Sequence, residues 1–179
     1  AHPDLPCTTF LGKTLTYREI GEKVERATRG LQRLGVRKGT KVGLFLPNSP
    51  TFIVFFFSVM KAGGTVVNFN PLYTVAELAQ QVKDSDTELM VTLDLQVLFG
   101  KVEALLESGC LKRAVVASFP ALLPVSKAVL FRLFKSKDLA RPLESPAREK
   151  IILEAEVMAG DGHAQKVKID PRTDVAVLQ

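Results

Sequence analysis

Residues 41–69 read KVGLFLPNSPTFIVFFFSVMKAGGTVVNF, and this stretch decides the fold. The apolar runs at its two ends, 42–46 and 65–69, are typical of strands buried on both faces of a parallel sheet. Between them, Ser49-Pro50 predicts the start of a helix and Gly63-Gly64 predicts its end. This helix is apolar on all sides, so we expect it to be largely buried. The stretch therefore predicts a strand–helix–strand unit with a right-handed crossover.

The alternation of strand and helix continues on both sides of this unit. Apolar runs at 89–93 and 114–117 predict two more strands, and helical patterns lie between the strands. We therefore expect an α/β fold, with a doubly wound, mostly parallel sheet flanked by helices. We divide the chain into a strand–helix repeat over 1–119, a basic amphipathic segment and polar linker over 120–170, and a further buried strand beginning within 171–179. In the linker we expect at most one short helix, around 149–157.

The predicted helices have recognisable ends. Thr16 and Glu19 have the spacing of a capping box, as do Thr74 and Glu77, and Asp94 is expected to be the N-cap of the fourth helix. The first helix is expected to end at a left-handed glycine, Gly35, and the fourth at Gly109. The apolar residues that we expect these helices to turn toward the core are Ile20, Val24, Ala27, Leu31, Leu34, Leu78, Val82, Leu98, Val102, Leu105 and Leu106.

The positive charge of the chain is local. Residues 101–141 carry eight Lys and Arg against three Asp and Glu, which accounts for the whole net charge of +5. The sequence has neither zinc-finger spacing nor the paired aromatics of an RNA-binding sheet, so we expect no nucleic-acid partner. Within this region, 122–137 interleaves apolar residues with Lys127, Arg132 and Lys135. Such a helix is suited to the interface of an anionic membrane, and the alternative is a helix packed on another part of a larger protein.

The compartment is predicted from what the sequence lacks. Cys7 and Cys110 stand far apart and outside any CxxC, which argues against a disulfide framework or a zinc site and favours a reducing environment. The longest apolar run, 52–62, is shorter than the roughly 20 residues of a membrane span. The first residues lack the basic and apolar regions of a secretory signal. We expect a cytoplasmic protein, with contact to the inner face of the membrane if 122–137 binds lipid.

Sequence motifs for chemistry are largely missing. There is no Walker A, GxGxxG or GxSxG pattern. His163 near Asp161 resembles an oriented base, but we expect a solvated loop histidine. Asp94 at the end of a strand resembles a phosphoacceptor, and helix capping explains it.

One further cluster lies just past a strand's carboxyl end, where open α/β sheets bind ligands. We expect it to be a turn that places Thr74 as a helix cap. The sequence thus predicts no catalytic, cofactor-binding or metal-ligating residue in this chain. The residues of the cluster are Asn68, Asn70, Pro71 and Tyr73.

Taken in order, these segments resemble the adenylate-forming superfamily, which includes acyl-CoA synthetases, aryl-CoA ligases, luciferases and peptide-synthetase adenylation domains. The run KAGGTVVNFNPLYT at 61–74, followed by Glu77-Leu78, is similar to long- and medium-chain fatty acyl-CoA synthetases, most of all to the bacterial long-chain ones, and aryl-CoA ligases carry nearly the same run. The other matching residues are Phe10, Gly12, Thr16, Tyr17 and Glu19, then Lys38-Gly39, Lys41-Val42 and Leu46-Pro47-Asn48-Ser49-Pro50.

The resemblance implies a two-step reaction that uses ATP with Mg²⁺ and CoA. A carboxylate attacks the α-phosphate of ATP to give an acyl adenylate and pyrophosphate, and the CoA thiol then displaces AMP. In the family a Ser/Thr/Gly-rich loop ending in Pro-Lys handles the phosphates, and it follows a strand like 174–179. We therefore expect an N-terminal fragment of a fatty acid–CoA ligase, inactive alone, whose partners are the remainder of its own chain, the fatty acid and CoA substrates, and a second subunit.

Three alternatives stay open at this point. The first is a fragment of an aryl-CoA ligase of the 4-coumarate type. The second is a non-enzymatic, flavodoxin-like binding domain, which should carry acidic or glycine-rich loops at its strand ends. The third is a membrane-surface module that uses the segment 122–137.

Overall fold

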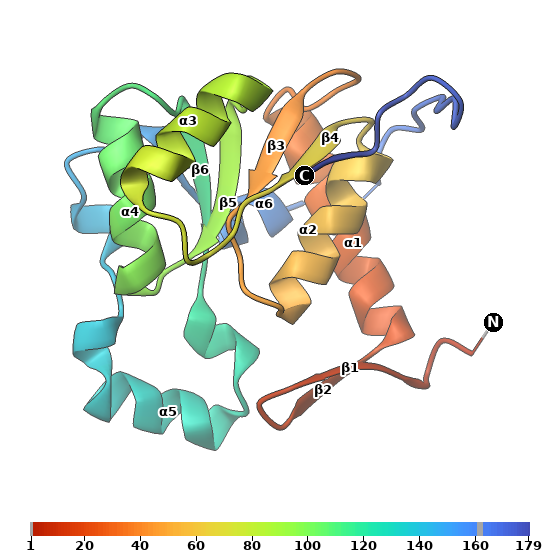
Figure 1. Ribbon diagram of the computed structural model, residues 1–179. Helices are drawn as coiled ribbons and strands as arrows, with labels where there is room; N and C mark the ends of the chain where they lie inside the picture. Colours follow the sequence, from red (N-terminus) through yellow and green to blue (C-terminus); the bar gives the residue numbers. More distant parts are fainter. Residues whose placement is uncertain (1, 161–162) are drawn as a thin grey trace.

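A computed structural model of the chain describes residues 2–160 and 163–179. Its centre is a sheet with the strand order β7-β6-β5-β3-β4-β8, in which all neighbouring strands are parallel (Figure 1). The strands are β3 (Lys41–Leu44), β4 (Thr65–Asn68), β5 (Leu89–Leu93), β6 (Arg113–Ala117), β7 (Ile151–Leu153) and β8 (Val177–Leu178). The four strands predicted from the apolar runs are confirmed.

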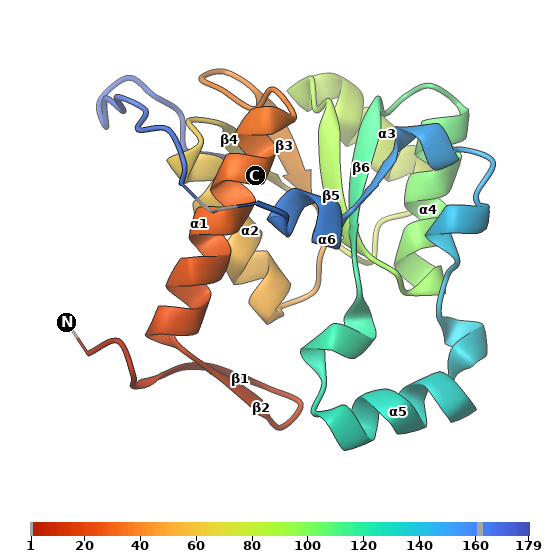
Figure 2. The same cartoon turned by 180° about the vertical axis from the view of Figure 1, so that it is seen from behind.

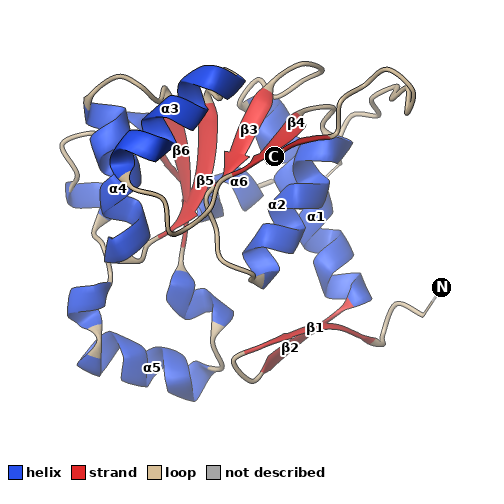
Figure 3. Cartoon of the chain, viewed as in Figure 1, coloured by secondary structure: helices blue, strands red, loops and turns tan. Residues whose placement is uncertain are grey.

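Helices cover both faces of the sheet. One face carries α1 (Tyr17–Arg33), α2 (Pro50–Lys61) and α6 (Glu154–Met158), and the opposite face carries α3 (Val75–Ser85) and α4 (Gln96–Glu107) (Figures 2 and 3). The chain passes from β3 to β4 on one side and returns to β5 on the other side of β3. This confirms the doubly wound α/β fold.

Local sequence signals set the helix ends. The Thr16 hydroxyl accepts the backbone N–H of Glu19 at 3.2 Å, and the Glu19 carboxylate accepts the N–H of Thr16 at 2.7 Å. Thr74 and Glu77 form the same reciprocal pair at the start of α3. α1 is followed by Gly35 at φ +91°, a conformation open to glycine at little cost. Both predicted capping boxes and the glycine stop are confirmed.

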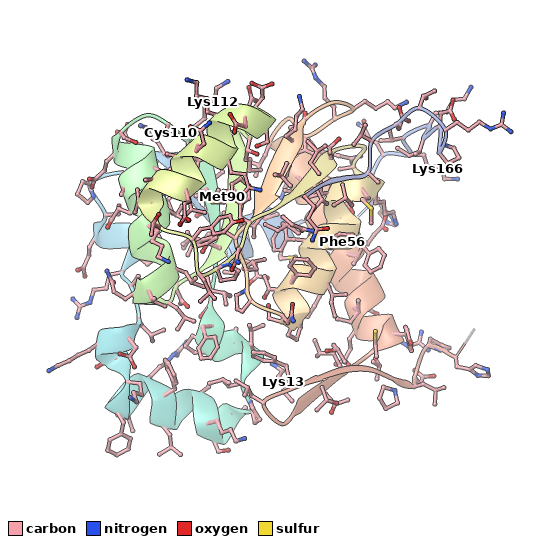
Figure 4. The ribbon with its side chains drawn as sticks, viewed as in Figure 1. Lys13, Phe56, Met90, Cys110, Lys112 and Lys166 are labelled. Atoms are coloured by element: carbon pink, nitrogen blue, oxygen red, sulfur yellow. The ribbon has the colours of Figure 1, made fainter. Side chains whose placement is uncertain are left out.

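The helix α2 is buried or half-buried except at Phe57 and Lys61. Val54, Phe55 and Val59 are buried against the sheet and α1, whereas Phe57 is 51% exposed. Phe56 lies on the outer side of the helix, half-buried, and stacks on Phe52 (Figure 4). The prediction of a largely buried α2 is confirmed, because only Phe57 and Lys61 of this helix are exposed.

The chain begins with an antiparallel hairpin that the sequence patterns did not predict. It consists of β1 (Pro6–Phe10) and β2 (Lys13–Thr16), joined by the two-residue loop Leu11-Gly12. Both loop residues have positive φ, +51° and +96°, as the tight turns of hairpins require. A leucine in place of the usual Asn or Asp hides this turn from sequence rules.

The predicted polar linker contributes a strand, β7. Its first residue, Ile151, is buried and pairs with Ala114 of β6. A three-residue strand is too short to produce a periodic pattern, so it could not be predicted from the sequence. The short helix expected around 149–157 is present only in its second half, as α6.

Between β6 and β7 the chain leaves the sheet and returns. This excursion consists of η1 (Phe119–Leu122), α5 (Val125–Phe134), η2 (Ser136–Asp138), η3 (Pro142–Glu144) and η4 (Arg148–Lys150). It passes beside the hairpin at the lower edge of Figures 1 and 2. Two lysines join the parts, since Lys13 Nζ donates to the Ala121 carbonyl at 2.7 Å and Lys127 Nζ donates to the Leu11 carbonyl at 2.8 Å. None of the described helices combines the length and apolarity needed to cross a bilayer.

The predicted C-terminal strand forms, but it is not buried. β8 pairs with β4, and the N–H of Val66 donates to the Ala176 carbonyl at 2.9 Å. Val175 is 56% exposed, because β8 is the outermost strand on its side of the sheet. The expected pairing is confirmed and the expected burial is wrong.

Candidate functional site

The carboxyl ends of the sheet strands are the first place to look for a site. The direction of winding changes between β3 and β5, and open α/β sheets bind ligands outside the strand ends at such a point. In Figure 3, η1 follows directly below the end of β6, and the hairpin lies below α1 and α2. In Figure 4, Lys13 of the hairpin lies toward the excursion that carries η1 and α5. The hairpin and η1 are thus joined to each other on the same side of the molecule as the carboxyl ends of the strands.

Asp94 follows β5 at this edge. It is not the N-cap of α4, because that position belongs to Leu95, which makes no side-chain capping bond. The Asp94 carboxylate instead accepts the backbone N–H of Phe119 at 2.6 Å and so fastens η1 to the end of β5. Burial raises the pKa of the Asp94 carboxyl, and the hydrogen bonds from Phe119 and Ser118 offset part of that rise. The prediction that Asp94 caps α4 is wrong, and the bond to Phe119 gives Asp94 a different structural role.

Behind η1 lies a small cavity of about 60 Å³. Two polar groups in its wall stand out. The Thr51 hydroxyl is buried and has no hydrogen-bond partner among the described residues, and Glu154 presents a carboxyl from the start of α6. A cavity of this size holds water and is far below the 300–1,000 Å³ typical of ligand pockets. The lining residues are Lys13, Leu15, Lys23, Pro50, Thr51, Val54, Ala121, Leu122 and Glu154.

Glu154 makes the stability of the chain depend on pH. Burial raises the pKa of its carboxyl, Lys23 lowers it in part, and Asp94 raises it again. The folded chain therefore holds this proton more tightly than the unfolded chain, so the contribution of Glu154 to stability falls as the pH rises through the raised pKa.

We expect Glu154→Gln to be more stable than the wild type at about pH 8, and the difference to narrow as the pH falls toward about 4. The measurement is the difference between the two free energies of unfolding in urea, recorded across that range. All other carboxyl groups are common to both proteins, so the difference isolates Glu154. A difference that does not change with pH would contradict a raised pKa.

The turn after β4 has the structural role predicted for it. The Asn70 side-chain oxygen accepts the N–H of Leu72 at 3.0 Å, and the Asn70 carbonyl accepts the N–H of Tyr73 at 3.0 Å. Lys101 Nζ donates to the carbonyls of Pro71 and Tyr73, at 3.3 and 2.7 Å. The Asn68 carbonyl accepts a hydrogen bond from Gln81. The turn places Thr74 at the start of α3, and its carbonyl groups hold the Lys101 side chain.

Histidine and metal chemistry find no support in the described part of the chain. His163 is exposed, and Asp161, the residue that would orient it as a base, lies outside the described residues. Cys7 and Cys110 are half-buried free thiols. Across 2–160 and 163–179, no group of three His, Cys, Asp or Glu side chains is placed to hold a metal ion. Near the sheet edge, the Thr51 hydroxyl and the Asn68 side-chain oxygen are buried without a hydrogen-bond partner in the described part of the chain.

An open apolar groove of about 620 Å³ lies between α1, α2 and the segment 169–176 that leads into β8. Four of its residues are large, apolar and exposed: Tyr17 from α1, Phe57 from α2, and Ile169 and Val175 from the segment before β8. An ion pair between Lys38 and Asp174 at 2.7 Å holds the approach to β8 in place. The groove is lined by Tyr17, Ile20, Gly21, Val24, Phe57, Met60, Lys61, Gly63, Gly64, Ile169, Asp174, Val175 and Ala176.

Several solved structures share this fold. Over 99% of this chain and 29% of its own length, a long-chain-fatty-acid-CoA ligase from Archaeoglobus fulgidus superposes with a TM-score of 0.67 at 25% identity. Coronafacic acid ligase from Pectobacterium brasiliense gives a TM-score of 0.74 over 98% of this chain and 30% of its own, at 14% identity. The second likeness concerns the fold alone.

The sequence is also similar to curated proteins. It is 32% identical over 177 residues to a long-chain-fatty-acid–CoA ligase of Bacillus subtilis, which covers 99% of this chain and 31% of the relative. It is 40% identical over 81 residues to 4-coumarate–CoA ligase 4 of Arabidopsis thaliana, which covers 45% of this chain and 14% of that protein. The chain thus spans about a third or less of the relatives it matches. Since residues 1–179 also match the family described as AMP-binding enzyme, the chain belongs to that family of adenylate-forming CoA ligases.

Proposed function

We propose that this chain is the N-terminal part of an ATP-dependent ligase that joins a long-chain fatty acid to CoA. The choice of a long-chain fatty acid as the substrate rests on how much of the chain aligns with each relative. The relative named as a long-chain ligase aligns with 99% of the chain, whereas the 4-coumarate ligase aligns with 45%. Membership of the family also removes the alternative of a free-standing flavodoxin-like domain.

Within such a ligase these residues act as scaffold. On the side of the carboxyl strand ends, the hairpin is bonded to η1, and the cavity next to them is water-sized. ATP, Mg²⁺ and CoA would therefore be bound mainly by residues outside the described chain. A reducing, cytoplasmic location agrees with the two free cysteines.

We expect the remainder of the polypeptide to cover the groove between α1, α2 and residues 169–176. β8 offers an unpaired strand edge within the described chain, and the neighbouring Phe57 and Val175 add apolar surface that water solvates poorly. The relatives are about three times as long as this chain, so residues to cover the groove exist in them. A contact with a second subunit is the other use of this face.

The test is the complete polypeptide that contains residues 1–179, assayed for ATP-dependent thioester formation. We expect kcat/KM for palmitate to exceed that for 4-coumarate by about tenfold or more, since each additional buried methylene contributes roughly 0.8 kcal/mol. Residues 1–179 alone should give no ATP–pyrophosphate exchange with either acid.

Two outcomes would count against the proposal. Preference for 4-coumarate would favour the aryl-CoA ligase, which the 40% identity over 81 residues keeps as the second candidate. Exchange activity in residues 1–179 alone would show that the chain holds a nucleotide site of its own, contrary to the scaffold role.

A further inference from the structure

The helix α5 stands apart from every other long helix of the chain, because none of its ten residues is buried. Val125 at its first turn is 83% exposed and Phe134 at its last is 78% exposed. Exposed apolar side chains of this size usually mark a surface that binds a partner. The helix is nevertheless held in place, since the rings of Phe119 and Phe131 are in contact at a centroid distance of 5.0 Å.

The exposed apolar residues of α5 share one face. Val125, Val129 and Leu133 follow one another at intervals of four residues, which places them in a row along the helix, and Leu130 and Phe134 form a second row beside it. Phe131 lies beside Phe134 around the helix and turns its ring toward Phe119. α5 therefore presents a continuous apolar face outward.

The hairpin tip extends this face. Leu11 is 51% exposed at a turn position with φ +51°, where Asn, Asp or Gly is ordinarily favoured. Lys127 Nζ donates to the Leu11 carbonyl at 2.8 Å and joins the tip to α5. An open groove of about 470 Å³ lies between them, lined by Leu11, Phe119, Leu123, Lys127, Leu130, Phe131, Phe134 and Lys135. We call the exposed set Leu11, Val125, Val129, Leu130, Leu133 and Phe134 the α5–hairpin surface.

Charge decides what such a surface binds. Residues 119–137 contain four cations and no acidic residue: Lys127, Arg132, Lys135 and Lys137. The first acidic residue that follows in the sequence is Asp138, whose carboxylate lies 3.7 Å from Lys135 Nζ, and Arg132 acts electrostatically on the buried Asp94. Two copies meeting through this face would bring like charges together, which disfavours a symmetric dimer here. An apolar face bordered by cations is complementary to a layer with an apolar interior and an anionic surface.

We infer that the α5–hairpin surface binds a bilayer containing anionic phospholipid. Leu133 and Phe134 with their apolar neighbours enter the boundary between headgroups and acyl chains, and Arg132 and Lys135 contact lipid phosphates. Leu11 enters beside them at the hairpin tip. This goes beyond the proposed ligase activity and does not depend on it, although a bilayer is where a long-chain acid is dissolved.

The test is sedimentation of the complete polypeptide with vesicles. The vesicles are phosphatidylcholine alone, or phosphatidylcholine with about one third phosphatidylglycerol. We expect binding to the anionic vesicles only. The double variant Arg132→Glu and Lys135→Glu should weaken it about thirtyfold or more, since each surface cation is worth roughly a factor of five. Leu133→Asp should weaken it about tenfold, because an inserted apolar side chain is lost.

The matched control is the double variant Arg26→Glu and Lys83→Glu, which changes the net charge equally through exposed residues of α1 and α3. Its binding should stay within about twofold of the wild type. Equal loss in the control would mean non-specific attraction and would overturn the inference. Absence of binding to anionic vesicles would mean that the rest of the polypeptide covers the surface. A dimer that Leu133→Asp dissociates, in a protein that ignores vesicles, would assign the surface to a second copy.

Discussion

Replacing Phe55 with alanine is expected to lower the free energy of unfolding by about 3–5 kcal/mol. Phe55 is fully buried where α2 packs on the sheet, so truncation removes ring contacts and leaves a cavity that the surrounding core cannot close completely. Urea denaturation followed by circular dichroism measures the loss. The expected effect is a large share of the total stability of an ordinary domain.

The matched control lies two residues further along the same helix. Phe57→Ala removes the same atoms from a side chain that is half exposed, so its free energy of unfolding should stay within about 0.5 kcal/mol of the wild type in residues 1–179. Similar losses in the two variants would mean that α2 presents a different face to the sheet. Because we assign Phe57 to the groove that the remainder of the polypeptide covers, the same variant should be costlier in the complete protein.

Gly30→Ala is expected to destabilise the chain by about 2–3 kcal/mol or more, although alanine is the better helix former by roughly 1 kcal/mol. A Cβ at this position in α1 would lie 2.0 Å from the Val157 carbonyl oxygen and 2.6 Å from Val157 Cγ1. Both the helix backbone and the backbone of α6 would have to move apart. Arg33 next to this contact donates to the Ala159 carbonyl at 2.8 Å, so the movement would also disturb that bond.

Gly21→Ala in the same helix should instead raise the free energy of unfolding. A Cβ at Gly21 meets nothing within 4 Å, so the change keeps only the gain in helix propensity, about 0.5–1 kcal/mol. Comparing the urea midpoints of the two variants separates packing from propensity. If Gly30→Ala were also stabilising, the close approach of α1 and α6 would be wrong.

The middle of the fold could be predicted because each of its signals is local. The capping pairs at Thr16 and Thr74 and the glycine stop at Gly35 specify helix ends through groups within a few residues of each other. Continuous apolar runs specify strands that are covered on both sides. Since caps, runs and stops alternate regularly, the doubly wound order of the sheet follows from them.

The rest depends on which segments meet, and that is not a local property. The run in α2 is apolar throughout, so nothing in it distinguishes buried Phe55 from exposed Phe57. The three residues of β7 become a strand because β6 offers a free edge, and Asp94 bonds Phe119 because the chain returns past it. The cavity beside Glu154 is built from segments more than a hundred residues apart, beyond the reach of any spacing rule.

The sheet order also governs how this chain is made. The inner strands β3, β4, β5 and β6 are complete by residue 117, while the strands that shield both rims, β7 and β8, are drawn from 151–153 and 177–178. At a synthesis rate of about 5–20 residues per second, the edges of β6 and β4 stay unpaired for several seconds while the polypeptide is still on the ribosome. Unpaired edges of β4 and β6 can pair with strands of neighbouring nascent chains, so we expect a chaperone present during that interval to raise the yield of folded protein.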